Sequence, residues 1–361
     1  MADRFRLSKT ALCAVAIAAA YAATALAGND SRRHKSIELE AQGSFYVAGK
    51  IFNIPSRVAS GTTPEPGLIS IDHAYVQYQI PEDKKYRFPV LMVHGGGHTG
   101  KTYETTPDGR EGWYTSFTRR GFASYVVDDP NRGRACCEPT ELHLVRMGLL
   151  PNTALPNMNI YTKEAAYTTF RFGPSYPNAY AGQRFPLGAI DQYAPQWVLT
   201  YRDAEENAKI TNAIIAAIDK IGPCIVMVHS QSGPLGLAAV LQRTNLVKGF
   251  VAIEPAGFAI PATETAAKLK NVPIFAVFGD NLASSPQSTG WLTSAQTTAD
   301  QVNASGGNAK VLPLATIGIR GNSHMMMMDN NNEQIADIIE KWVGKNVRKA
   351  LDHDHDHGGR D

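Results

Sequence analysis

Short apolar runs and longer amphipathic stretches follow one another along most of the chain. Apolar or alternating runs bounded by turn-forming residues predict strands at residues 44–47, 69–80, 88–93, 123–127, 224–229, 247–253, 274–278 and 311–314. Apolar positions at helical spacing predict helices at residues 113–120, 203–221, 235–242, 294–303 and 334–347. Strands that alternate with helices are typical of parallel sheets with right-handed crossovers. The pattern predicts an α/β fold, with a mostly parallel sheet flanked by helices.

One long segment, residues 136–200, interrupts this alternation. It has little strand character and many aromatic residues, namely Tyr161, Tyr167, Phe170, Phe172, Tyr176, Tyr180, Phe185, Tyr193 and Trp197. We expect a partly helical cap, inserted at about 136–200, that covers one edge of the sheet. Residues 60–67, rich in Gly, Thr and Pro, predict a surface loop between the first two strands.

The two ends of the chain have distinct compositions. Arg4, Arg6 and Lys9 precede an apolar stretch at residues 11–23, and residues 25–27 (ALA) form a small-residue cleavage site. This pattern predicts a cleavable signal peptide at residues 1–27 and a periplasmic or secreted protein; the apolar stretch is short for a membrane span. Residues 351–361 predict a disordered His/Asp-rich tail, which leaves 28–350 as the folded domain.

Composition and charge narrow the class of partner. The 361 residues are 43% hydrophobic and 19% charged, an ordinary globular composition. Loss of residues 1–27 removes three basic residues and one acidic residue, which changes the net charge from +2 to 0. A neutral chain argues against nucleic acid or an anionic membrane as the main partner. We therefore expect a small-molecule partner and no stable membrane insertion; the oligomeric state, a homodimer included, is open at this point.

Three cysteines remain after the leader, namely Cys136, Cys137 and Cys224. Their pairing is not fixed by the sequence. A bridge between the adjacent pair would close a strained ring, because neighbouring Cα atoms lie about 3.8 Å apart. Cys224 opens a predicted strand and is expected to be a small buried apolar side chain.

Residues 226–233 (VMVHSQSG) hold the most informative motif of the chain. An apolar strand ends on a serine and turns directly into a helix, which is the nucleophile elbow of α/β-hydrolases, usually written G-x-S-x-G. Ser230 directly follows a strand of ordinary length and is favoured as the nucleophile. Ser232 is the alternative, although Pro234 follows it two residues later. A serine that only caps the following helix would give the same local pattern.

A serine nucleophile needs a base and an acid, which in this fold follow it in the order serine, acid, histidine. His324 lies between the last predicted strand and the last predicted helix, where the fold places its base. Two acids are candidates: Glu254 ends the strand after the elbow helix, and Asp280 ends the next strand. Ligands bind at the carboxyl ends of parallel strands, so spacing alone does not separate the two acids.

The run His94-Gly95-Gly96-Gly97 follows a predicted buried strand and allows the backbone to approach a substrate closely. We assign the two donors of an oxyanion hole to the backbone N–H groups of Gly96 and Gln231. The run lacks the G-x-G-x-x-G pattern of dinucleotide binding. No cofactor and no metal site are expected.

Taken together, these motifs resemble the secreted or periplasmic bacterial α/β-hydrolase esterases of the Alcaligenes esterase type. The matching runs cover most of the mature chain in order: residues 104–110 (ETTPDGR), 170–174 (FRFGP), 229–233 (HSQSG), 251–255 (VAIEP) and 321–327 (GNSHMMM). The resemblance implies carboxylester hydrolysis with Ser230 as nucleophile, Glu254 as acid and His324 as base. It thereby favours Glu254 over Asp280. The glycines after Gly95 differ from the bulkier residues of the family.

The sequence thus leads to the hypothesis of a serine carboxylesterase that acts through an acyl-enzyme on a small-molecule ester. An amidase or peptidase with the same triad is one alternative. A noncatalytic small-molecule-binding protein on a hydrolase scaffold is another, from a different class.

Overall fold

A computed structural model describes residues 36–57, 65–136, 139–201, 204–260 and 263–347. The contacts divide the chain after Glu38, and every element below belongs to the unit Leu39–Asp361. The expected signal peptide at 1–27 and the expected tail at 351–361 lie outside the described residues, as does Cys137.

An eight-stranded sheet forms the centre of this unit, in the order β1-β2-β4-β3-β7-β8-β9-β10. β1 and β2 pair antiparallel, as do β2 and β4, and all later pairs are parallel. The strand bounds are β1 Leu39–Arg57, β2 Glu65–Pro81, β3 Val90–Val93, β4 Ser124–Asp128, β7 Cys224–His229, β8 Val247–Ile253, β9 Ile274–Phe278 and β10 Ala309–Pro313. The mostly parallel α/β sheet predicted from the sequence is confirmed.

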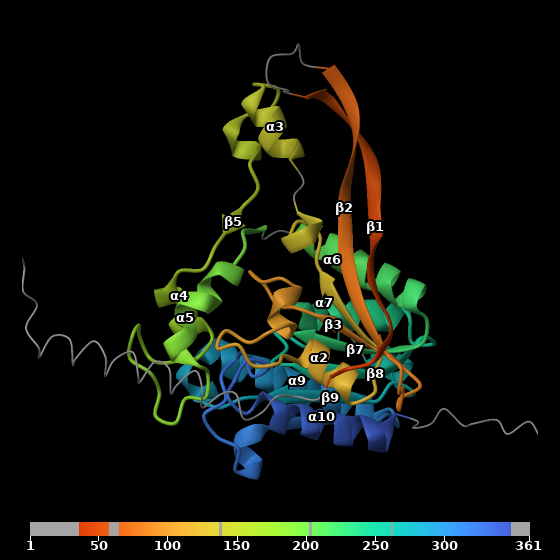
Figure 1. Ribbon diagram of the computed structural model, residues 1–361, viewed down its shortest axis with the longest axis vertical. Coiled ribbons are helices and arrows are strands. Elements are labelled where there is room, and N and C mark those ends of the chain that lie inside the picture. Colours follow the sequence, from red (N-terminus) through yellow and green to blue (C-terminus); the bar gives the residue numbers. More distant parts are fainter. Residues whose placement is uncertain (1–35, 58–64, 137–138, 202–203, 261–262, 348–361) are drawn as a thin grey trace, which may run out of the picture. The chain divides into compact units, whose positions relative to one another are not determined.

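Helices cover both faces of the sheet (Figure 1). α6 (Ala204–Ile221), α7 (Ser232–Gln242), α8 (Thr263–Lys268) and α9 (Pro286–Ala304) contribute to one apolar core. α2 (Trp113–Arg119) and α10 (Asn332–Asn346) contribute to the core on the other face. Side chains of a strand alternate between the two: Val226 and Val228 of β7 belong to the first core, and Ile225 and Met227 to the second.

The structure corrects several expected boundaries. β1 and β2 form a much longer hairpin than residues 44–47 and 69–80 indicate. β1 continues through Ala48 and Gly49, which both have positive φ, and through Pro55. Pro55 falls within the register shift between Ile54 and Arg57, where the ladder with β2 is irregular and a missing N–H is tolerated. α9 starts at Pro286 rather than 294, because the Ser285 side chain caps it and proline occupies its first turn.

The insertion carries small elements between β4 and α6, drawn in yellow to green in Figure 1. They are α3 (Thr140–Arg146), α4 (Lys163–Thr169), α5 (Ile190–Tyr193) and a two-stranded sheet of β5 (Met158–Asn159) and β6 (Thr200–Tyr201). Aromatic residues of this segment, Phe170, Phe172 and Tyr193 among them, are buried in the same core as α2 and α10. Across the described part of the chain, no helix combines the length and apolar character that a bilayer crossing requires.

Candidate active site

Ser230 lies in a sharp turn between β7 and α7. Its φ is +52°, a left-handed conformation that side-chain-bearing residues rarely adopt. The turn is held because the Ser230 N–H donates to the Ile253 carbonyl at 3.0 Å and the Ser230 carbonyl accepts from Gly233 and Ala256. A Cβ at Gly233 would lie 2.5 Å from Pro255 Cβ, so only glycine lets α7 approach the segment after β8 this closely. The turn has the strand-to-helix geometry of a nucleophile elbow.

The structure brings Ser230, His324 and Glu254 together from three distant parts of the chain. His324 Nε2 lies 2.9 Å from Ser230 Oγ, and His324 Nδ1 lies 3.2 Å from Glu254 Oε2. Ser230 is partly exposed, whereas His324 and Glu254 are buried. With its proton on Nδ1, the imidazole donates to Glu254 and can accept the serine proton at Nε2.

Burial and neighbouring charges set the protonation states of the acid and the base. Burial alone would raise the pKa of the Glu254 carboxyl, but Arg171 and His324 outweigh it and lower this pKa to about 2. Burial lowers the pKa of His324 below its usual 6.5, against the opposing effect of Glu254. At neutral pH the pair therefore consists of an ionised carboxylate and a neutral imidazole, the state that a general base requires.

The two alternative residues have other partners. The Ser232 hydroxyl donates to the His94 carbonyl and is buried in the first turn of α7. The Asp280 carboxylate accepts from the N–H groups of Asn281 and Gly321, at 2.8 and 2.9 Å. Each of these contacts fixes a loop of the site, and the two ring nitrogens of His324 contact Ser230 and Glu254 instead.

Gly96 and Gln231, the expected oxyanion donors, line one cavity together with Ser230 and His324. Gln231 is the N-cap residue of α7, so its backbone N–H lies at the end of the helix where donors lack intrahelical acceptors. Its side chain accepts from Arg132 Nη2 at 3.1 Å. A Cβ at Gly96 would lie 2.6 Å from Gln231 Oε1, so a larger residue would compete with this side chain for space.

The cavity above Ser230 has a volume of about 520 Å³. Its walls come from the elbow, from α6, α7 and α9, and from the insertion; the lining residues are Gly96, Tyr161, Thr169, Phe170, Asn207, Ser230, Gln231, Pro234, Leu235, Ala256, Gln287, Trp291 and His324. The ring of Phe170 is parallel to the His324 imidazole, with centroids 5.9 Å apart, and Trp291 lies 5.6 Å from it. The insertion therefore contributes a wall of this cavity.

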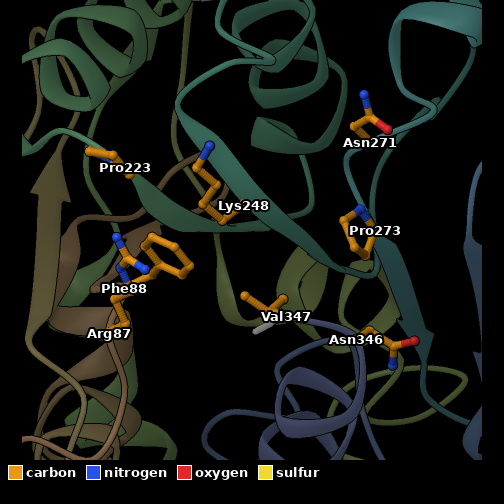
Figure 2. A pocket seen from close by; sticks show the side chains of 8 residues that line it. All are labelled: Arg87, Phe88, Pro223, Lys248, Asn271, Pro273, Asn346 and Val347. Carbon is orange, nitrogen blue, oxygen red and sulfur yellow. The ribbon is translucent and has the colours of Figure 1, made fainter. Parts of the chain in front are cut away.

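A second cavity, of about 480 Å³, lies at the opposite end of the strands (Figure 2). Its lining includes Phe88, Pro223 and Pro273, which precede β3, β7 and β9, and Lys248 near the start of β8. Ser230 and Glu254 instead follow the carboxyl ends of β7 and β8. Open parallel sheets bind ligands at their carboxyl ends, so the cavity above Ser230 is the candidate active site.

Cys136, Cys224 and the methionine run 325–328 lie outside the site. Cys136 is disulfide-bonded, whereas Cys224 is a free buried thiol whose pKa is raised to about 12 by burial. Met325 to Met328 are fully or almost fully buried in the core beside α10. Among the residues that the structure describes, no group of three His, Cys, Asp or Glu side chains is placed to hold a metal ion.

Two arginines of the site were not assigned a role from the sequence. Arg171, in the insertion, contacts Glu254, and Arg132, after β4, contacts Gln231. Both are almost fully buried. A single arginine in a segment without periodicity gives no sequence signal of such a contact, although Arg171 falls within the run FRFGP that carries the family resemblance.

The chain is similar to known ester hydrolases. It is 28% identical over 366 aligned positions to "Probable secreted lipase phiG" from Fungal sp. (strain ATCC 74256), covering 85% of this chain and 90% of that protein. It is also 33% identical to a novel bacterial esterase with an atomic-resolution structure, with a TM-score of 0.82 and coverage of 87% of this chain and 98% of the esterase. No protein-family model matches the chain. The α/β-hydrolase fold and these relatives establish that the chain belongs to the family of ester hydrolases represented by that bacterial esterase.

Proposed function

We propose that the protein is a serine carboxylesterase in which Ser230 is the nucleophile, His324 the general base and Glu254 the acid. The observation that carries the proposal is the pair of contacts of one imidazole, 2.9 Å to Ser230 Oγ and 3.2 Å to Glu254 Oε2. A serine hydroxyl is a weak nucleophile at neutral pH, and a base within hydrogen-bond distance activates it.

The reaction starts when Ser230 Oγ attacks the ester carbonyl carbon and its proton moves to His324 Nε2. The carbonyl oxygen becomes an oxyanion, which accepts from the N–H groups of Gly96 and Gln231. Glu254 stabilises the imidazolium and holds its orientation. The tetrahedral intermediate collapses, the ester C–O bond breaks, and the alcohol leaves with the proton from His324.

Water completes the cycle by attacking the acyl-enzyme. His324 takes a proton from the water, the second tetrahedral intermediate collapses, and the carboxylic acid leaves as Ser230 regains its proton. The described residues that line the cavity include no Asp, Glu, Lys or Arg. This lining favours an uncharged ester, since a charged group would lose hydration without gaining a partner.

The test compares Ser230→Ala with Ser44→Ala, which removes an exposed hydroxyl from β1. We expect wild type and Ser44→Ala to hydrolyse p-nitrophenyl butyrate and to incorporate one fluorophosphonate per chain. Ser230→Ala should lose both properties while remaining folded. Full turnover by Ser230→Ala would rule the proposal out. A p-nitroanilide substrate cleaved as fast as the ester would favour an amidase instead.

We further propose that the protein is exported and that its leader is removed after Ala27. The basic start, the apolar stretch and the small residues at 25–27 support this proposal, and the lipase relative is named as a secreted protein. N-terminal sequencing of the exported protein should give Gly28 as the first residue. An intact Met1 on the mature enzyme would contradict it.

A further inference from the structure

Arg171 is a buried arginine of the insertion that no step of the proposed reaction uses. It is 1% exposed, and its side chain reaches three other segments. Nη2 lies 2.5 Å from Glu254 Oε1, Nε donates to the Asp280 carbonyl at 2.9 Å, and Nη1 donates to Ser288 Oγ at 3.3 Å. The guanidinium therefore joins the loops after β8 and β9 to the first turn of α9.

The contact with Arg171 determines which carboxylate oxygen faces the base. Glu254 Oε1 accepts from Arg171 Nη2 and from the Gly279 N–H, both at 2.5 Å. Glu254 Oε2 is left to face His324 Nδ1. Both donors lie on the same carboxylate oxygen, and the guanidinium is itself held by the Asp280 carbonyl and by Ser288, so a rotation of the carboxylate would break both hydrogen bonds to Oε1. Arg171 thus restricts the rotation of the Glu254 carboxylate.

Phe170, the residue before Arg171, contacts His324, the base that faces Glu254. The backbone N–H of His324 donates to the Phe170 carbonyl at 3.0 Å, and the Phe170 ring is stacked parallel to the imidazole. Gln183 Nε2 donates to the carbonyls of Arg171 and Phe172, at 2.7 and 3.1 Å. Two consecutive residues of the insertion therefore contact the base and the acid.

Backbone conformation gives an independent indication that Arg171 belongs to the site. Ser230, Glu254 and Arg171 have φ values of +52°, +49° and +56°. A non-glycine residue in this region costs free energy, and such residues cluster at functional sites. The left-handed turn at Arg171 lies where consecutive residues contact different members of the triad.

We propose that Arg171 is a positioning residue of the triad, through which the insertion fixes the Glu254 carboxylate against His324. This inference rests on the proposed esterase function. Arg171 touches neither substrate nor Ser230 in this role; it acts through Glu254. The insertion then serves in catalysis as well as in forming a wall of the substrate cavity.

The charges around Glu254 and His324 are consistent with a positioning role of Arg171. Glu254 is fully buried, and an isolated buried carboxylate would be protonated rather than ionised. Arg171 supplies the positive charge that keeps the pKa of Glu254 low and also lowers the pKa of His324. Two other histidines interact with His324; burial lowers the pKa of His98 to about 3 and that of His229 well below 6.5, so both are neutral.

The experiment measures kcat, KM and the pH profile for p-nitrophenyl butyrate in Arg171→Met. We expect kcat to fall by about 10²-fold with KM nearly unchanged, because the variant disturbs proton transfer rather than binding. The acidic limb of kcat/KM should move to higher pH, since both Glu254 and His324 lose a nearby positive charge and bind protons more readily. A merely structural defect would lower activity equally at every pH.

The matched control is Arg184→Met, another arginine of the insertion. Arg184 Nε donates to the Arg320 carbonyl at 2.6 Å and contacts no triad residue. We expect wild-type kcat and an unmoved acidic limb for this variant. In a double-mutant cycle, adding Arg171→Met to Glu254→Gln should cost little further activity, because the acid through which Arg171 acts is already neutral.

Arg171→Lys provides a second test if Arg171→Met does not fold. A single ammonium keeps the charge but cannot reach Glu254, the Asp280 carbonyl and Ser288 together, so kcat should fall while the acidic limb stays close to wild type. Wild-type kcat in Arg171→Lys would overturn the inference, as would independent, multiplying losses in the double mutant. If Ser230→Ala is inactive, the esterase proposal stands whatever the Arg171 variants show. An active Ser230→Ala would overturn both the esterase proposal and the role of Arg171.

Discussion

Glu254 Oε2 lies 3.2 Å from Nδ1 of His324, although 70 positions separate the two residues in the chain. Glu254 follows β8 and Asp280 follows β9, and these neighbouring parallel strands end at the same edge of the sheet. The acid contact of His324 thus comes from the strand directly after the elbow helix, and the carboxylate on the next strand contacts a loop instead. Substitution of Glu254 should therefore affect turnover, whereas substitution of Asp280 should affect mainly stability.

Glu254→Gln should lower kcat by about 10³- to 10⁴-fold, because an amide cannot stabilise the imidazolium and favours the wrong tautomer. Asp280→Asn should reduce kcat less than tenfold and instead lower the free energy of unfolding by about 1–3 kcal/mol, since it weakens the contacts with Asn281 and Gly321. Steady-state kinetics and urea unfolding of both variants test this difference. The opposite order of kcat values would make Asp280 the acid.

Ser232→Ala should keep the chemistry and lose stability. The Ser232 hydroxyl donates to the His94 carbonyl, and both residues are buried. Its removal should lower the free energy of unfolding by about 1–3 kcal/mol while kcat stays within a few-fold of wild type. Peptide mapping after fluorophosphonate treatment should still find the label on Ser230. Label on Ser232 in the wild type would contradict the assignment.

Substitutions in the glycine run should affect turnover in a definite order. A Cβ at Gly95 would lie 2.7 Å from His229 Nδ1 and 2.9 Å from Ser230 Cβ, whereas a Cβ at Gly96 would meet only the Gln231 side chain this closely. We expect Gly95→Ala to lower kcat by about 10²-fold or more, because it displaces the nucleophile from the oxyanion donors. Gly96→Ala should be milder, since the end of a side chain can move.

The control for this series is Gly188→Ala in the insertion. A Cβ there would have no atom within 4 Å, and the residue does not have positive φ. Its kcat and thermal midpoint should match wild type. Equal activity in all three variants would show that the glycine run does not border the reacting carbonyl.

Local sequence patterns point to part of this candidate site. Ser230 stands out as the candidate nucleophile because an apolar run that ends on serine and continues as a helix is a local pattern. The acid was not separable, because Glu254 and Asp280 both end strands and differ only in how the following loops turn. Arg171 was missed because its contact with Glu254 spans 83 positions and its segment has no periodicity. Spatial proximity of this kind depends on tertiary packing rather than on spacing.

The helices and strands also differ in how well local sequence patterns predict them. The buried parallel strands were predicted within a few residues, because apolar runs between turns specify them. The hairpin was underestimated because Gly49 and Pro55 interrupt its alternation, and pairing across the hairpin overrides these weak local preferences. The start of α9 was missed because its first turns, at Pro286 and beyond, contain few apolar residues. There a side-chain cap at Ser285, rather than hydrophobic periodicity, marks the boundary.

Asp129, buried behind the glycine run, should make folding stability depend on pH. It is 0% exposed, and burial raises its pKa from 3.8 to about 7, although Arg132 opposes this shift. From about pH 4 to 7 the unfolded chain has lost this proton while the folded protein keeps it, so stability falls as pH rises and levels off above about 7.

The variant Asp129→Asn tests this dependence, because its amide does not titrate. The free energy of unfolding of the variant minus that of wild type should therefore increase across this range and then stay constant, as measured by urea unfolding at several pH values. Parallel curves for the two proteins would mean that Asp129 titrates alike in both states.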